Sequence, residues 1–244
     1  MSTHTPHPVV WIAGSSRGIG RALAVAFGQQ GWRIAIHGRT DSDALHQTKS
    51  LVEHTGADTM TVTGDVRDGD AMRNGVAAIT QTWGRLNAAV VNAGIAASAL
   101  TIKTTMDQWQ ETLATNLTGC FHTLRAAGEA MTTQGGGHVV VVGSFAGAQG
   151  QQGQAAYAAS KAGLIGLVRS AAREWGAANV RVNLVLPGWH ATDLAGEDFP
   201  GHGLGDHLLG RTADLQEVAR SIVHLASCRD VSGQVWNLDS RPLP

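Results

Sequence analysis

VVWIAGSSRGIG, residues 9–20, is the stretch of sequence that decides the fold. Val9–Ala13 is a continuous apolar run typical of a buried strand, and Gly14, Gly18 and Gly20 follow it where helical periodicity begins. Glycines at such a turn let the backbone approach a pyrophosphate, whose charge is stabilised at a helix N-terminus. The order of strand, glycines and helix favours a dinucleotide site over a plain tight turn, although the spacing is G-x-x-x-G-x-G rather than the commoner G-x-G-x-x-G.

The rest of the chain repeats this alternation of strand and helix. Gly20–Gln30 and Gln154–Trp175 have the spacing of crossover helices. Strands covered by helices on both faces are apolar throughout rather than at alternate positions, and the apolar runs here have that character. We therefore predict an α/β fold, a single-domain, doubly wound, Rossmann-type sheet of seven parallel strands with helices on both faces. The predicted strands are Val9–Ala13, Arg33–His37, Thr59–Val62, Ala88–Val91, His138–Val142, Val180–Leu186 and Gln234–Leu238.

Composition limits the classes of partner. The 244 residues carry 18 Lys and Arg against 19 Asp and Glu, so no strong field attracts nucleic acid or an anionic membrane. Two cysteines far apart make no disulfide framework, and no apolar run has signal-peptide or membrane-spanning length. We expect a cytoplasmic protein with a small-molecule partner, a disordered leader over residues 1–8, and one dinucleotide-binding catalytic domain over residues 9–244 with a short substrate lid at about residues 190–210.

Two arginines indicate which dinucleotide is bound. An acidic residue at the end of the second strand would bond the ribose hydroxyl of NAD, but this strand ends in His37-Gly38-Arg39. Arg17 lies inside the glycine loop, so two guanidinium groups are placed to pair with a 2′-phosphate. The sequence therefore predicts NADP(H) as cofactor; the alternative is that both arginines face solvent.

Further cofactor contacts are expected at two strand ends. Asp65-Val66 follows the third strand, where the carboxylate would lie near the adenine amino group or would cap a helix. Asn92-Ala93-Gly94 ends the fourth strand, at the carboxyl edge where open α/β sheets bind ligands. Small residues at this edge leave room for the cofactor.

Tyr157 and Lys161 form the candidate catalytic pair. They are four residues apart in a helical segment, so they lie on one face across a turn. Tyr157 is the only tyrosine and Lys161 is one of three lysines, which makes a chance pairing a poor explanation. A phenol gives up its proton reluctantly near neutrality, and a nearby ammonium stabilises the phenolate. The alternative is an amphipathic helix with the tyrosine packed and the lysine solvated.

Two further polar residues are candidates for the same site. Ser144 follows the fifth strand thirteen positions before Tyr157, where its hydroxyl could polarise and orient a substrate carbonyl. Asn116 interrupts the predicted helix Asp107–Leu124, in which asparagine is a poor helix former. It indicates a local function or a tolerated kink.

Together these motifs resemble the short-chain dehydrogenase/reductase family of the classical type. The resemblance covers about Val9 to Asp239 and rests on G-S-S-R-G-I-G (14–20), N-A-G (92–94), Asn116, Ser144, Y-A-A-S-K (157–161) and P-G (187–188). It implies that Tyr157 is the general acid/base, that Lys161 activates it and holds the nicotinamide ribose, and that Ser144 binds the carbonyl. It also implies that Asn116 supports a water-filled proton relay.

The resemblance places other residues around the cofactor and implies an oligomer. Ser16 belongs to the phosphate-binding loop, Ile19 flanks the cofactor, Pro187-Gly188 lines the nicotinamide, and Thr192 bonds its carboxamide. Family members are usually homotetramers, and the small residues along Gln154–Leu167 fit packing against a symmetry mate, in a tetramer or a dimer. The alternative is burial of these residues against the chain's own sheet.

Within the family, the chain is most similar to the bacterial 3-oxoacyl-[acyl-carrier-protein] reductases, through Ala158–Leu167 and Leu209-Gly210-Arg211. Those enzymes dock a carrier protein with basic residues that Thr132–Gly137 and Gly176–Asn179 lack, so a carrier-protein partner is disfavoured. Asp239-Ser240-Arg241 also replaces the usual D-G-G.

The predicted function is NADPH-dependent reduction of a ketone, either a 3-oxoacyl thioester or another small carbonyl compound. One alternative is an NAD(P)-dependent dehydrogenase that oxidises an alcohol, a sugar or an alicyclic hydroxyl. Another is a non-catalytic NADP(H)-binding sensor. No metal site is predicted, because His190, His202 and His207 lack a regular ligand spacing with a carboxylate or cysteine.

Overall fold

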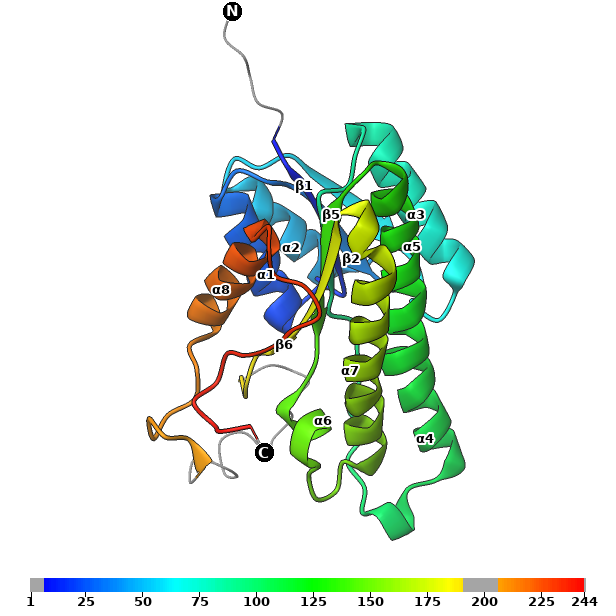
Figure 1. Cartoon of the computed structure of the whole chain (residues 1–244), viewed down its shortest axis with the longest axis vertical. Helices are drawn as coiled ribbons and strands as arrows, with labels where there is room; N and C mark the ends of the chain where they lie inside the picture. The colour runs from blue at the N-terminus through cyan, green and yellow to red at the C-terminus, as the bar shows by residue number, and fades with distance from the viewer. Residues whose placement is uncertain (1–6, 191–205, 244) are drawn as a thin grey trace, which may run out of the picture.

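The computed structural model describes residues 7–190 and 206–243 (Figure 1). Seven parallel strands form one sheet in the order β3-β2-β1-β4-β5-β6-β7, so the predicted doubly wound α/β fold is confirmed. The strands are β1 (Val9–Ala13), β2 (Arg33–Gly38), β3 (Thr59–Thr63), β4 (Ala88–Val91), β5 (Gly137–Val142), β6 (Val180–Leu186) and β7 (Val235–Asn237).

Helices cover both faces of this sheet, as Figure 1 shows. On one face lie α1 (Gly18–Gln29), α2 (Asp43–Glu53) and α8 (Leu215–Ser227), and on the other α3 (Gly69–Trp83), α5 (Gly119–Thr133) and α7 (Ala155–Trp175). Shorter elements lie toward the carboxyl edge of the sheet or link the main ones: η1 (Thr101–Lys103), α4 (Met106–Leu113), η2 (Ala114–Thr118), α6 (Phe145–Gln149) and η3 (Gly176–Ala178).

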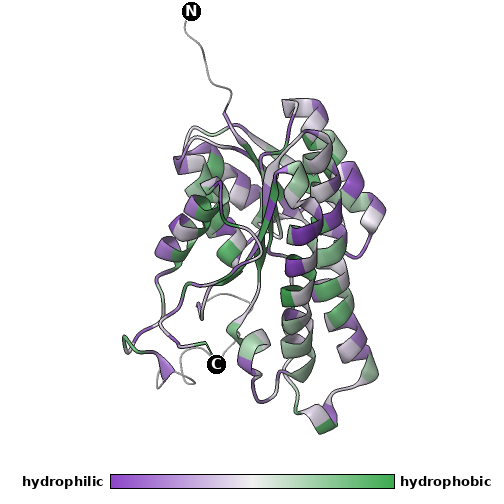
Figure 2. Ribbon diagram, viewed as in Figure 1, coloured by the Kyte–Doolittle hydropathy of each residue, from purple (hydrophilic) through white to green (hydrophobic). Residues whose placement is uncertain are grey.

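The core is divided by the sheet into two apolar layers, because successive strand side chains point to opposite faces. In β1, Trp11 packs with the layer under α3, α5 and α7, whereas Val10 and Ile12 pack with the layer under α1 and α8. All five residues of β1 are buried. The residues that the helices bury in these two layers are apolar, and Figure 2 maps the hydropathy of the whole ribbon. Burial on both faces accounts for strands that are apolar throughout.

Strand order places a crevice at the carboxyl ends of β1 and β4. The chain runs from β1 outward to β2 and β3, then returns to pair β4 with the other side of β1. Ligands of open α/β sheets bind where the strand order reverses in this way. The loops that follow β1 and β4 are the two that carry the predicted cofactor residues Gly14–Gly20 and Asn92–Gly94.

The helix predicted over Asp107–Leu124 has its irregularity at Asn116. The segment is helical throughout, but α4 ends at Leu113 and the chain forms one π-helical turn over η2 before α5 begins. A π turn is wider than an α turn and lengthens the hydrogen-bonded ring by one residue. Asn116 lies in this turn, so its low helix propensity marks a real irregularity.

The predictions for the two ends of the chain and for the lid are only partly covered by the described residues. Of the leader expected over residues 1–8, residues 1–6 lie outside them, and the His7 ring hydrogen bonds to the carbonyl oxygen of Gly31. Most of the lid expected at about residues 190–210 lies outside them as well. In the parts that the structure does describe, no helix is long and apolar enough to cross a bilayer, and both cysteines are free.

Candidate active site

In the glycine loop after β1, the backbone of Gly20 packs directly against the backbone of Gly14. Gly14 has φ +76°, and a Cβ on Gly20 would lie 2.1 Å from the Gly14 carbonyl oxygen, so no larger residue fits there. Asn92, at the end of β4, donates from Nδ2 to the same oxygen at 2.7 Å. The N-terminus of α1 has no side-chain cap, which leaves its first N–H groups for a phosphate. The loop therefore fits a dinucleotide pyrophosphate.

His37, at the end of β2, holds this loop from behind. Its Nδ1 accepts a hydrogen bond from the Gly14 amide at 3.1 Å, and its backbone exchanges hydrogen bonds with Ser15. Burial lowers the pKa of His37 from 6.5 to about 4, against smaller opposing effects of Gly64 and Asp65. The ring is therefore neutral near pH 7 and available as an acceptor.

The residues expected to choose between NAD and NADP lie beside this loop. Arg17 is the N-cap residue of α1 and lines a second cavity of about 520 Å³ between α1, α2 and α8. Arg39 follows β2 and is exposed. Beyond β3, Asp65 forms a 2.5 Å ion pair with Arg67, and the Arg67 hydrogen bond, aided by the charge of Arg39, lowers its pKa.

Only some atoms of Val66 and of Ser16 are available for contact with a cofactor. The Val66 side chain is buried in the core against Gly119, so only its backbone is left to face a ligand. The Ser16 carbonyl oxygen accepts hydrogen bonds from Arg21 at 2.7 Å and from Thr48 at 3.0 Å. Arg21 and Thr48, which sequence reasoning missed, thus fix the shape of the glycine loop.

Ser144, Tyr157 and Lys161 lie together on the wall of a cavity of about 790 Å³ at the carboxyl edge of the sheet. Tyr157 and Lys161 are one turn apart on α7, with the ammonium nitrogen 5.8 Å from the centre of the tyrosine ring. Lys161 is buried, and its Nζ donates to the Val142 carbonyl oxygen at 2.8 Å, which fixes it beneath the cavity. Ser144 is the N-cap of α6, and its Oγ accepts from the Ala146 amide at 3.2 Å.

Asn116 is the hub of a buried hydrogen-bond network behind Tyr157. Its Oδ1 accepts from the Ile95 amide at 2.8 Å, and its Nδ2 donates to the Ile95 carbonyl oxygen at 2.9 Å and to Ser160 Oγ at 3.1 Å. Ser160 in turn donates to the Tyr157 carbonyl oxygen at 2.7 Å. The network ties the loop after β4 to the helix that carries the tyrosine. Asn116 does not line the 790 Å³ cavity, and Ser160 connects it to the helix that carries Tyr157.

The opposite wall of the cavity is formed by the turn that follows β6. Pro187, Gly188, Trp189 and His190 line it, together with Ile19 and Gly94 from the cofactor loops. His190 is buried, which lowers its pKa, and its Nε2 is 2.8 Å from the Pro187 carbonyl oxygen. Thr192 lies outside the described residues.

Sequence reasoning missed two residues of this region for different reasons. Ser160 lies inside the Y-A-A-S-K motif, and its position three residues after Tyr157 was a usable signal for a bond to the helix backbone. Arg241 lines the cavity from the far end of the chain, and no pattern of spacing connects it with residues 144–161. Its only signal was the departure from D-G-G.

The described residues contain no group of three or more His, Cys, Asp or Glu placed to hold a metal ion. Of the three histidines weighed as ligands, His202 lies outside those residues. His190 hydrogen bonds to a backbone carbonyl oxygen, and His207 Nε2 is 3.3 Å from a carboxylate oxygen of Asp239.

Known proteins with similar sequences identify the family of this chain. The profile of the short chain dehydrogenase family matches residues 8–202. The chain belongs to this family. It is similar to the human 3-oxoacyl-[acyl-carrier-protein] reductase, with 35% identity covering 93% of this chain and 94% of the relative. It is also similar to the Staphylococcus aureus protein of that name, with 30% identity covering 93% and 95%.

Solved structures of short-chain dehydrogenases have the same fold. A short-chain type dehydrogenase/reductase from Mycobacterium marinum superposes with a TM-score of 0.90 at 29% identity, covering 96% of this chain and 94% of that one. Levodione reductase superposes with a TM-score of 0.88 at 28% identity, covering 96% of both chains. The chain is therefore an oxidoreductase of the family, and a nicotinamide cofactor fits the glycine cradle between β1 and α1.

Proposed function

We propose that this short-chain dehydrogenase reduces a ketone to a secondary alcohol with NADPH, and that Tyr157 donates the proton. The observation that carries the proposal is the Lys161 ammonium 5.8 Å from the Tyr157 ring centre, on the wall of a cavity that Ser144 also lines. An ammonium at this distance stabilises the phenolate that remains after proton transfer. The Ser144 hydroxyl polarises and orients the carbonyl.

The reaction balances with one hydride and one proton. Bound NADPH supplies the hydride for the carbonyl carbon. The Tyr157 hydroxyl supplies the proton for the carbonyl oxygen and is reprotonated from solvent through the relay in which Asn116 takes part. The Gly14–Gly20 loop holds the pyrophosphate and Lys161 holds the nicotinamide ribose. Further cofactor contacts come from Asp65, Val66, Asn92, Ala93, Gly94, Pro187, Gly188 and Thr192.

Positively charged side chains near the proposed site for the adenosine part of the cofactor favour NADPH over NADH. Arg17 and Arg39 flank the end of β2, and the residue there that would select NAD is not acidic. The human and S. aureus relatives are reductases by name. Oxidation of an alcohol, sugar or alicyclic hydroxyl by the same residues is the reverse reaction. It is disfavoured because cells keep NADP mostly reduced.

The substrate is a 3-oxoacyl thioester or another small ketone. The two relatives act on carrier-bound acyl groups by name, whereas in this chain Thr132–Gly137 and Gly176–Asn179 carry no basic side chain for an acidic carrier protein. A substrate that is free of the carrier protein therefore fits this surface better.

We further propose a cytoplasmic homotetramer, or a dimer. Along α7, Ala159, Ala162, Gly163 and Gly166 are exposed rather than packed against the chain's own sheet, and Phe121 on α5 is 41% exposed. Small residues on one helix face allow the close approach of a second copy. Light scattering of the purified protein tests this, and a monomeric mass at micromolar concentration refutes it.

Absorbance of NADPH, followed with acetoacetyl thioesters and a panel of free ketones, tests the proposed reaction. Tyr157→Phe removes the hydroxyl that carries the transferable proton and keeps the ring, so we expect turnover to fall by at least about 100-fold while NADPH affinity stays nearly constant. Retained turnover in this variant contradicts the mechanism. If NADPH binds but no ketone oxidises it, the chain is a non-catalytic sensor.

A further inference from the structure

Arg241 is a charged side chain on the wall of the 790 Å³ cavity to which the proposed mechanism gives no role. Only 6% of its surface is exposed, yet it lines the same cavity as Ser144 and Tyr157. Its guanidinium carbon is 4.2 Å from the centre of the Phe145 ring, and Phe145 is the neighbour of Ser144 along the chain. A guanidinium in this position is stacked on the aromatic face and close to the residue proposed to orient the carbonyl.

Asp239 fixes the orientation of this guanidinium. Its Oδ2 accepts hydrogen bonds from Arg241 Nε at 2.9 Å and from Nη2 at 2.6 Å, and its Oδ1 accepts from the Arg241 amide at 2.9 Å. The carboxylate is fully buried under the turn after β6, where a Cβ on Gly188 would lie 2.7 Å from Oδ2. Burial raises the pKa of Asp239, but the hydrogen bonds of Arg241 and the charges of Arg241 and His207 give a net lowering.

The ion pair leaves part of the guanidinium for a ligand. Asp239 occupies Nε and Nη2, and Nη1 has no hydrogen-bond partner among residues 7–190 and 206–243. An arginine carries five N–H donors in a planar fork, so an arginine that is paired along one edge still presents donors along another. Because the negative charge of Asp239 offsets the positive charge of Arg241, the guanidinium acts here as an oriented, charge-assisted hydrogen-bond donor rather than as a free cation.

The rest of the cavity wall supports an oxygen-rich ligand. Of the described residues that line it, Lys161 and Arg241 are cationic and none is an aspartate or glutamate. Lys161 is engaged by the Val142 carbonyl oxygen, which leaves Arg241 as the cationic donor among the described lining residues, beside Phe145. A donor that faces the cavity with no hydrogen-bond partner among the described residues favours ligands that carry an acceptor and disfavours those that lack one.

We propose that Arg241 is a specificity-determining residue that binds a second oxygen of the substrate, the carboxylate or acyl carbonyl oxygen of a dicarbonyl compound, while the ketone lies between Ser144 and Tyr157. The inference rests on the proposed ketone reduction and narrows its substrate class. Simple ketones without a second oxygen leave Nη1 unpaired, so they are poorer substrates than oxo acids, oxo esters or oxoacyl thioesters of the same length.

Matched ketones test the proposal. Methyl acetoacetate carries the second carbonyl, acetoacetate replaces it with a carboxylate, and 2-hexanone has the same chain length as the ester but no second oxygen. In the wild type, kcat/KM should favour the oxo compounds, and in Arg241→Met that preference over 2-hexanone should fall by about 10-fold or more, the factor typical of a charge-assisted hydrogen bond. The two oxo compounds separate recognition of a carbonyl from recognition of a carboxylate.

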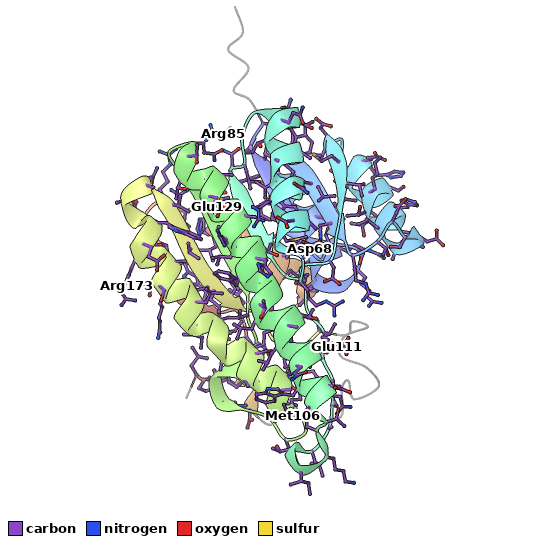
Figure 3. All side chains as sticks on the ribbon, turned by 90° about the vertical axis from the view of Figure 1, so that its right-hand side faces the viewer. Asp68, Arg85, Met106, Glu111, Glu129 and Arg173 are labelled. Carbon is purple, nitrogen blue, oxygen red and sulfur yellow. The ribbon has the colours of Figure 1, made fainter. Side chains whose placement is uncertain are left out.

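Control variants separate recognition from folding. Arg173, on the solvent side of α7 in Figure 3, is exposed and away from the cavity, so Arg173→Met should leave the preference intact. The double variant Asp239→Asn/Arg241→Met removes the buried pair together, leaving no unpaired charge. It should melt close to the wild type and show the same loss of preference. Arg241→Lys keeps the charge without the fork, and we expect it to recover only part of the preference.

A binding measurement distinguishes failure of this inference from failure of the proposed function. Calorimetric titration of methyl acetoacetate into the enzyme needs no turnover, and Arg241→Met should weaken binding by about 10-fold. If no ketone causes NADPH oxidation but Arg241→Met still weakens the binding of methyl acetoacetate, the reductase proposal is refuted and the role of Arg241 in ligand binding is supported. An equal loss for methyl acetoacetate and 2-hexanone, or no loss for either, overturns the role of Arg241.

Discussion

Acid should destabilise this protein through His37, because its neutral ring accepts the Gly14 amide in the folded state. The pKa of His37 is lowered from 6.5 to about 4 by burial, so the unfolded chain binds more protons than the folded chain between these values. The stability due to this histidine is fully present above pH 6.5 and is lost as the pH falls toward 4. The difference of about 2.5 pKa units corresponds to about 3 kcal/mol of unfolding free energy.

Urea unfolding at a series of pH values, at one fixed protein concentration, measures this effect. His37→Asn is the matched variant, since its amide oxygen can accept the Gly14 hydrogen bond but does not titrate. Other titrating groups, including His138, whose pKa burial lowers to about 4, are common to both proteins and cancel in the difference. From about pH 7.5 to 4.5 the wild type should lose about 2.5 kcal/mol more than the variant. A difference that is constant with pH refutes the reasoning.

Three other predictions address the site. Lys161→Met removes an ammonium 5.8 Å from the Tyr157 ring centre. The attraction between this ammonium and the phenolate is worth about 3 kcal/mol at a dielectric constant of about 20, so kcat for a ketone should fall about 100-fold in an NADPH absorbance assay. Gly20→Ala puts a Cβ against the Gly14 carbonyl oxygen and should weaken NADPH binding at least about 10-fold in a fluorescence titration, whereas Gly176→Ala, with nothing within 4 Å, should not. Asn116→Leu removes three hydrogen bonds, one of them buried and two partly buried, and should lower the free energy of unfolding in urea by about 3 kcal/mol; a change under about 1 kcal/mol contradicts the network.

Much of the fold followed from local patterns in the sequence. Apolar runs identify the strands to within a residue or two, because parallel strands buried on both faces tolerate few polar residues. Tyr157 and Lys161 could be placed on one helix face from their spacing alone. The π turn at η2 could not be placed, because it depends on the contacts of Asn116 with Ile95 and Ser160, and these residues are far apart in the sequence.

The features that the sequence does not predict are contacts between residues on different elements. The sequence does not show that the Val66 side chain packs against Gly119 in the core and leaves only the backbone for the predicted cofactor contact, because this depends on the packing of α5. Arg241 is visible in the sequence only as a departure from a motif, because folding brings it to Phe145, which is 96 residues away in the sequence, whereas its ion-pair partner Asp239 is only two residues away. Periodicity predicts which face of an element is buried, and contacts between distant elements decide what each residue touches.

The π turn between α4 and α5 has a consequence for how this protein can change in evolution. Deleting one residue from Ala114–Thr118 would let the two helices join in a regular α-helix with standard hydrogen bonds. Because the wider turn takes up the extra residue locally, this deletion would leave the apolar side chains of α5, among them Leu124 and Met131, facing the core. It would instead move Asn116 and break its hydrogen bonds to Ile95 and Ser160. Single-residue deletions at this point should therefore spare the fold and be selected against only where the Asn116 network has a function.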